Sequence, residues 1–220
     1  MINQKKALII LEVLLVVFVG VLVLRWVLLN KAIKNNEDYL SGTFNSSAKQ
    51  TLTSPTVLTS DPFQGSDKAE TIIVTYEDFT CAYCSQMSLN LKELANKYPD
   101  KVKVVWKDFV GNLEQTGLRS AMAARCAQAQ GKFWEFHDVL FANQNALSDT
   151  FYKQIASDLG LEQTRFNSCF ENQETLPLIQ NSFSEGLALG VDATPYVFLG
   201  EERLSGLVSF EELEKLINTD

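Results

Sequence analysis

Two cysteines, Cys81 and Cys84, stand three residues apart where a strand pattern gives way to a helix pattern. The run TIIVTY, residues 71–76, is β-branched and aromatic, which is typical of a buried strand. After the cysteines, apolar residues recur every three or four positions as far as Pro99, which predicts an amphipathic helix. The sequence therefore places Cys81 at a helix N-terminus and Cys84 one turn inside that helix.

This placement has a chemical consequence, because only a thiolate attacks a disulfide and a helix N-terminus stabilises negative charge. Cys81 is the candidate nucleophile, since a free thiol pKa of about 8.5 can fall to roughly 3.5–7.5 in such a setting. Cys84 can then attack the mixed disulfide and release the partner molecule. We predict a catalytic, reversible dithiol/disulfide pair that needs no cofactor.

Two other interpretations of the cysteine pair remain open. Half a zinc site has the same spacing, but it needs two further ligands. The chain has no second CxxC and a single histidine, His137, so we predict no metal site. A purely structural disulfide between Cys81 and Cys84 closes so short a loop that it contributes little chain-entropy stabilisation.

Charge excludes one class of partner. Residues 67–220 carry 13 Lys and Arg against 23 Asp and Glu, within a chain of net charge -8. A domain this acidic repels phosphate backbones, so we expect no nucleic-acid partner.

The N-terminal segment indicates how the domain is held. Residues 7–24 are apolar with one charge, and as a helix they span about 27 Å, enough to cross a bilayer. This run is longer than the apolar region of a cleavable signal peptide. We therefore predict a short cytoplasmic segment (1–6), an uncleaved transmembrane anchor (7–29), a Ser/Thr-rich linker (30–66) and one soluble domain (67–220). The sequence KKALIILEVLL also resembles the N-terminus of type IV pilin-like proteins, with cleavage after Ala7, although the rest of the chain does not.

Three ordered motifs, DFTCAYC, RCAQAQGKFWEFHDVLF and GVDATPYVFLG, resemble those of DsbA-like thiol:disulfide oxidoreductases of the thioredoxin superfamily. The resemblance covers residues 69–220 and implies an α/β thioredoxin-like fold with an inserted helical domain, here about 113–189. The sequence supports this layout through a second strand at 102–106, only helical patterning over the proposed insertion, and a hairpin at 196–199 and 203–205. Ser209 and Glu212 fit a capping box for a last helix.

The resemblance also implies a substrate-binding groove. It identifies Thr194 and Pro195 as a cis-proline pair that faces the cysteines, and we expect Ala82 and Tyr83 to contact the substrate beside it. A cis bond costs little before proline, and such a bend exposes backbone groups to an extended peptide. The alternative is an ordinary trans proline at the start of the strand YVFLG.

The chain departs from the family pattern at two places. Many relatives have a carboxylate six residues before the first cysteine, where this chain has Thr75. Strand alternation puts Glu77 on the same side as Thr75 and Asp78 on the other, so the proton acceptor for the second cysteine is left open. The dipeptide between the cysteines also lacks the histidine that strengthens oxidation in relatives, which predicts a milder oxidant.

Cys126 and Cys169 fall in the predicted helical insertion, 43 residues apart. If Cys81 pairs with Cys84, one pairing remains for them. We predict a structural disulfide that stabilises the insertion by roughly 4 kcal/mol and indicates an oxidising compartment. Two buried free thiols are the alternative. We interpret His137, among Phe and Trp residues, as a packed residue rather than a proton shuttle.

These inferences predict a membrane-tethered, extracytoplasmic thiol:disulfide oxidoreductase, in the periplasm or on the cell surface. Its expected partners are reduced or misoxidised polypeptides and an unidentified membrane protein that resets its redox state. Reductase or isomerase action uses the same residues, and sequence does not report a reduction potential. A redox-dependent peptide-binding protein without turnover is the rival from another class.

Overall fold

A computed structural model describes residues 20, 23, 25–26, 52–111 and 115–218. The chain divides into two compact units, residues 1–50 and 51–220. The predicted cytoplasmic segment, most of the transmembrane anchor and residues 30–51 of the predicted linker lie outside the described residues. Gly20, Val23, Arg25 and Trp26 are helical and exposed. Within the described part of the chain, no helix is long and apolar enough to span a bilayer.

The second unit contains a five-stranded sheet in the order β1-β3-β2-β4-β5, with helices on both faces. β2 and β3 are parallel, and the other neighbouring strands are antiparallel. The elements in chain order are β1 (Phe63–Gly65), β2 (Thr71–Glu77), α2 (Ala82–Lys97), β3 (Val102–Asp108), α3 (Gln115–Gln128), α4 (Phe133–Ala142), η2 (Gln144–Ala146), α5 (Asp149–Asp158), α6 (Gln163–Glu171), α7 (Leu176–Leu189), β4 (Tyr196–Leu199), β5 (Glu202–Ser205) and α8 (Phe210–Ile217).

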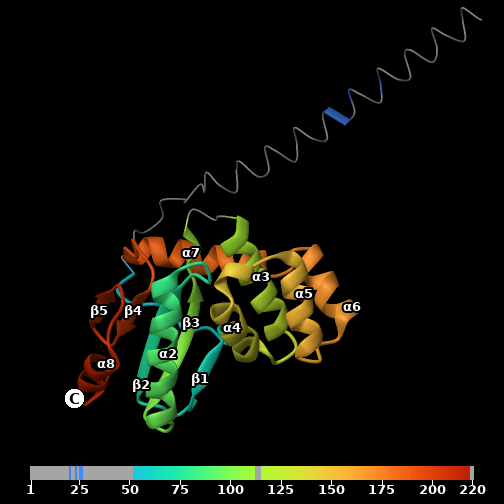
Figure 1. Cartoon of the computed structure of the whole chain (residues 1–220). Helices are drawn as coiled ribbons and strands as arrows, with labels where there is room; N and C mark the ends of the chain where they lie inside the picture. Colours follow the sequence, from blue (N-terminus) through green and yellow to red (C-terminus); the bar gives the residue numbers. More distant parts are fainter. Residues whose placement is uncertain (1–19, 21–22, 24, 27–51, 112–114, 219–220) are drawn as a thin grey trace, which may run out of the picture. The chain divides into compact units, whose positions relative to one another are not determined.

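The helical insertion predicted at about 113–189 is confirmed, because every helix from α3 to α7 lies between β3 and β4. Figure 1 shows α3 to α6 gathered beside the sheet while α7 runs across it. The predicted α/β fold with an inserted helical region is therefore the fold of this unit.

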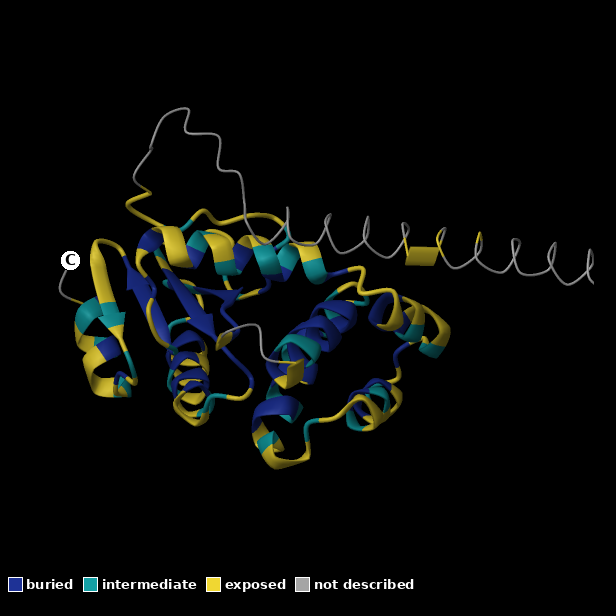
Figure 2. Cartoon of the chain, turned by 90° about the horizontal axis from the view of Figure 1, so that it is seen from above, coloured by how far each residue is buried: buried dark blue, intermediate teal, exposed yellow. Residues whose placement is uncertain are grey.

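Alternation along β2 decides which side chains face the cysteines. Ile73 packs with Met87 and Leu91 of α2, whereas Val74 and Tyr76 pack in the cluster on the α7 side. Because successive strand residues point to opposite faces, Thr75 and Glu77 face the α2 side with Ile73. Figure 2 shows the central strands buried between helices whose outer faces are exposed.

The C-terminal end of the predicted linker differs from the structure. The domain begins near residue 51 rather than at 67, and Phe63–Gly65 forms edge strand β1 against β3. Asp61 is buried, and its carboxylate is 2.8 Å from Nζ of buried Lys107. This buried ion pair and the strand pairing hold a stretch whose composition alone indicated a tether.

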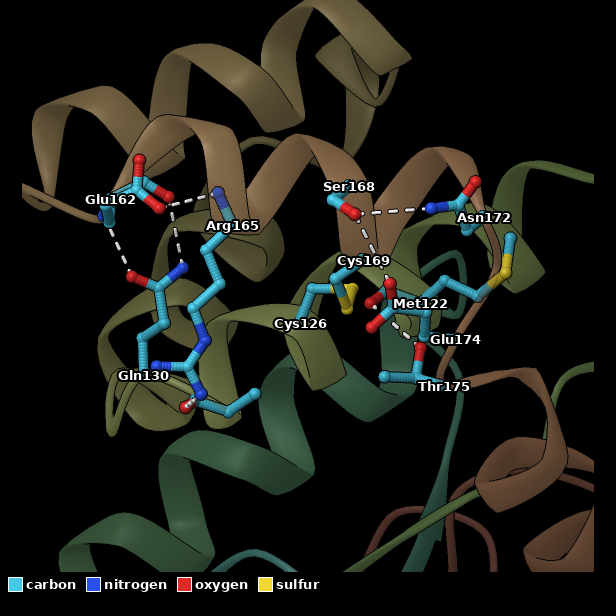
Figure 3. Close-up of a disulfide and its surroundings, with 11 residues drawn as sticks. Met122, Cys126, Gln130, Glu162, Arg165, Ser168, Cys169, Asn172, Glu174 and Thr175 are labelled. Carbon is cyan, nitrogen blue, oxygen red and sulfur yellow. Dashed lines mark hydrogen bonds between the residues drawn. A yellow bond between two sulfur atoms is a disulfide. The ribbon is translucent and has the colours of Figure 1, made fainter.

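A disulfide joins Cys126 of α3 to Cys169 of α6 (Figure 3), with the two Cα atoms 5.9 Å apart. A buried ion pair joins the insertion to the sheet: Nε of Arg125 in α3 donates to Oδ2 of Asp108 in β3 at 2.7 Å. Removing either charge would leave its partner buried and unpaired, which typically costs about 3–5 kcal/mol.

Candidate redox site

Cys81 is the N-cap of α2, in extended conformation (φ -84°, ψ 119°). Its Sγ accepts a hydrogen bond from the backbone N–H of Cys84 at 3.3 Å. The turn before it is fixed by Asp78, whose Oδ1 accepts from the amide and the hydroxyl of Thr80, both at 2.8 Å. The carbonyl of Asp78 accepts from the Cys81 amide at 3.0 Å. A capped helix start thus aims amide donors at the Cys81 sulfur.

The two thiols differ strongly in acidity. Hydrogen bonds from the Cys84 thiol and the Cys84 and Tyr83 amides outweigh partial burial and lower the pKa of Cys81 to about 6. Burial, the hydrogen bond to Cys81 and the charge of Glu77 raise the pKa of Cys84. Both cysteines are free thiols, Cys84 buried and Cys81 partly exposed. Cys81 is therefore the sulfur that is ionised and accessible at neutral pH.

Glu77 is the titratable carboxyl beside this pair. It is 1% exposed, and its Oε1 accepts a hydrogen bond from the Thr75 hydroxyl at 2.7 Å. Its Oε2 is buried and has no hydrogen-bond partner among the residues that the structure describes. Burial, together with the charge of Cys81, raises the pKa of Glu77 to about 8, against the lowering effect of Thr75. A carboxyl that titrates near pH 8 and is electrostatically coupled to both thiols can exchange a proton with Cys84.

The Thr194–Pro195 peptide bond is cis. The carbonyl oxygen of Thr194 lies 3.4 Å from Sγ of Cys81, which donates to it when the thiol is protonated. Pro195 is buried, and its own carbonyl accepts from the amide of Gly206 at 2.8 Å. The structure thus brings the cysteines and the cis-proline loop together although more than a hundred residues separate them.

Two of the remaining predicted site residues lie beside Cys81, and the other two lie in the helical insertion. Ala82 and Tyr83 are exposed in the first turn of α2, where the Tyr83 side chain stands 67% accessible beside Cys81. Cys126 and Cys169 form their disulfide within the insertion. Among the described residues, no cluster of three or more His, Cys, Asp or Glu side chains could hold a metal ion.

His137 is buried in α4 and belongs to the packing behind the site. Its ring meets Trp106 and Phe141 edge to face, with centroids 5.0 and 4.8 Å apart. Its Nε2 lies 3.2 Å from the Ser88 hydroxyl and its Nδ1 3.0 Å from Asp138. Burial lowers the pKa of His137, which favours the neutral ring, in agreement with its interpretation as a packed residue.

Sequence reasoning missed one side chain at the centre. Gln144, in the turn η2 between α4 and α5, donates through Nε2 to the carbonyl oxygens of Phe79 and Cys81, each at 2.9 Å. It lies about sixty residues from the cysteines, and no local pattern links the two segments.

Comparison with known proteins places most of the described domain in one family. Residues 58–219 match the protein family described as Thioredoxin. Among curated proteins, the chain is 29% identical over 146 residues to the Na(+)/H(+) antiporter NhaA of Herminiimonas arsenicoxydans, covering 66% of this chain and 23% of that protein. The chain spans about a quarter of the length of the curated relatives it matches.

Two solved structures share the fold. The thiol-disulfide exchange protein alpha-DsbA2 of Wolbachia pipientis superposes with a TM-score of 0.67 at 24% identity, covering 73% of this chain and 87% of that one. Oxidised BdbD of Bacillus subtilis gives a TM-score of 0.68 at 14% identity, covering 76% and 96%. At these identities the likeness shows the fold alone.

Proposed function

The chain belongs to the thioredoxin family, and on that premise we propose that it is a thiol-disulfide oxidoreductase whose reactive pair is Cys81 and Cys84. The observation that carries the proposal is the position of Cys81, a partly exposed N-cap sulfur that accepts from the Cys84 amide at 3.3 Å and lies 3.4 Å from the Thr194 carbonyl oxygen. The pKa of this thiol, lowered to about 6, agrees with that position. Thr194, Ala82 and Tyr83 form the surface on which an extended substrate would lie, shaped by the buried cis-proline Pro195.

The exchange proceeds through a mixed disulfide. A substrate thiolate attacks Sγ of Cys81, the Cys81–Cys84 bond breaks, and Cys84 leaves with the electron pair and takes up a proton. The second substrate thiol, as thiolate, attacks the substrate sulfur of the mixed disulfide and releases Cys81 as a thiolate. Two electrons pass from the substrate to the cysteine pair for each disulfide formed.

Glu77 serves as proton donor and acceptor for Cys84 in this scheme. In its protonated form it supplies the proton that the departing Cys84 sulfur requires. In the reverse direction its carboxylate removes the Cys84 proton, so that Cys84 can attack the mixed disulfide. Its burial and its coupling to Cys84 support the assignment.

The acidity of Cys81 favours oxidation of substrates. Lowering a thiol pKa from 9.0 to about 6 stabilises the dithiol form by a factor of about ten at pH 7, since the thiolate dominates. For a two-electron couple that factor corresponds to about 30 mV. We therefore propose a protein disulfide oxidase of moderate strength.

We also propose that the enzyme acts outside the cytoplasm, tethered by residues 7–29. The apolar run there has the length of a bilayer span, and the Cys126–Cys169 disulfide suits an oxidising compartment. Reduced polypeptides would be its substrates, and a membrane redox partner would reoxidise it. Carbonate extraction of membranes, comparing the full chain with one lacking residues 1–29, tests the tether: extraction of the full chain into the soluble fraction would refute it.

The decisive experiment measures oxidation of a reduced polypeptide and reduction of insulin side by side, with the reduction potential determined against glutathione. We expect oxidation to dominate, and a potential well below that of the compartment would refute the oxidase direction in favour of reductase action. Cys84→Ala should accumulate mixed disulfides through Cys81. If it traps no substrate while peptide binding persists, the protein is a redox-dependent binding protein instead.

A further inference from the structure

Gln144 of the helical insertion makes polar contacts with the redox turn. Its single amide nitrogen carries two N–H groups, and the two carbonyl oxygens it meets belong to Phe79 and Cys81, each 2.9 Å away. Gln144 is half-buried in the short turn η2. Its amide group therefore joins two peptide units on either side of Thr80.

Those peptide units set the position of the Cys81 sulfur. On the N-terminal side, the Cys81 amide is held by the carbonyl of Asp78 at 3.0 Å. On the C-terminal side, the Cys81 carbonyl accepts both from Gln144 and from the amide of Ser85, the latter at 3.3 Å. With both ends fixed, Sγ stays within reach of the Cys84 amide.

The Gln144 contact also affects the electrostatic potential at Cys81. Each carbonyl oxygen is the negative end of a peptide dipole, and two of them flank the residue that carries the thiolate. A donor amide placed on both oxygens offsets that negative potential. Loss of the donor would therefore disfavour the thiolate twice, by loosening the turn and by leaving the two oxygens uncompensated.

We propose that Gln144 is a positioning residue for the redox centre, through which the helical insertion sets the reactivity of the Cys81 thiol. The inference deepens the proposed function and rests on it. It assigns Gln144 no contact with substrate: the residue acts through the backbone of Phe79 and Cys81.

The test compares variants of the full chain by the pH dependence of iodoacetamide alkylation of Cys81 in the reduced protein. Gln144→Met keeps the length of the side chain and removes both donors. We expect the alkylation pKa of Cys81 to rise by about half to one unit, a three- to tenfold loss of thiolate at pH 5. Gln144→Glu keeps the shape but turns an acceptor toward the two oxygens, so it should raise the pKa further.

Gln130→Met is the matched control. Gln130 also bridges backbone within the insertion, since it donates to the Glu162 carbonyl at 3.3 Å and accepts from the Glu162 amide at 2.8 Å (Figure 3). The Gln130→Met variant should unfold at a lower urea concentration than the wild type, and its Cys81 pKa should not change. An equal rise in both Met variants would overturn the inference, because it would show a general loosening of the insertion.

Two further outcomes separate this inference from the proposed function. A wild-type Cys81 pKa near 6 that stays unchanged in folded Gln144→Met and Gln144→Glu overturns the role of Gln144 and leaves the oxidoreductase standing. A wild-type pKa equal to that of free cysteine overturns the proposed function itself. Should Gln144→Met not fold, the isosteric Gln144→Glu carries the comparison.

Discussion

Replacing Glu77 by Gln tests the proton transfer on which the proposed chemistry depends. With a pKa of about 8, Glu77 is about one-tenth ionised at pH 7 and about nine-tenths ionised at pH 9. The group able to remove the Cys84 proton therefore becomes about ten times more abundant over that interval. Gln keeps an oxygen for the Thr75 hydroxyl but binds no proton. We expect the step in which Cys84 attacks the mixed disulfide to slow roughly a hundredfold at pH 9.

The assay mixes reduced protein with an aromatic disulfide that releases a coloured thiol at each step. The first thiol reports attack by Cys81 and the second reports attack by Cys84. In the wild type the second rate should rise from pH 7 to pH 9 with a midpoint near 8. In Glu77→Gln that rise should disappear while the first rate at pH 6 changes little, because Glu77 is protonated there.

Thr75→Val is the matched control, since it keeps the carboxyl and removes the hydrogen bond that lowers its pKa. The midpoint for the second step should then move above 8 without loss of the maximal rate. The reasoning is refuted if Glu77→Gln retains the wild-type profile, or if Thr75→Val leaves the midpoint in place.

Three further predictions concern stability in urea. Relative to Glu77→Gln, the free energy of unfolding of the reduced wild type should fall by up to about 5 kcal/mol as the pH rises from 4.5 to 8. The reason is that an acid whose pKa is raised in the folded state destabilises the fold once it ionises. A stability difference between the two proteins that does not vary with pH would contradict this. Changing both Cys126 and Cys169 to Ser should cost about 4 kcal/mol, and unfolding that is indifferent to the change would contradict the chain-entropy argument. Asp108→Asn should lower the free energy of unfolding by about 3–5 kcal/mol, since it leaves Arg125 charged and buried without its anion. A double variant that also carries Arg125→Met removes the unpaired charge and should be more stable than Asp108→Asn alone; equal instability would argue against that cause.

The sequence predicts the elements that carry the cysteines, because local pattern and tertiary role agree there. The strand expected at 71–76 is β2, Thr71–Glu77, and the amphipathic helix that follows is α2. Residues 52–66 show the opposite case. Their place in the domain depends on Asp61 meeting Lys107, far along the chain, and on a three-residue edge strand. Neither leaves a periodic signal in a Ser/Thr-rich stretch.

The candidate site shows the same limit. Strand alternation gave the face of Glu77 but not its burial, and burial is what raises its pKa toward 8. Gln144 is polar, half-buried and in a short turn, so nothing local distinguishes it from a surface glutamine. The raised pKa of Glu77 and the backbone contacts of Gln144 both depend on what the fold packs around the residue. The neighbours of that residue in the sequence do not encode this packing.

The insertion also holds the redox turn by a second route, through side chains. Phe79 stacks on Trp106 at 4.9 Å, and the indole N–H of Trp106 donates to the same Asp108 that pairs with Arg125 of α3. Neither cysteine of the Cys126–Cys169 disulfide makes a polar contact on these routes, although Cys126 directly follows Arg125 in α3. Cys126 is nine residues, about 13 Å, along α3 from Gly117, the point where that helix packs closely against Asp78. Removing the disulfide should therefore lower stability and leave the reduction potential unchanged, whereas removing the Gln144 donor should change the potential. The two losses distinguish an insertion that only stabilises the domain from one that tunes its chemistry.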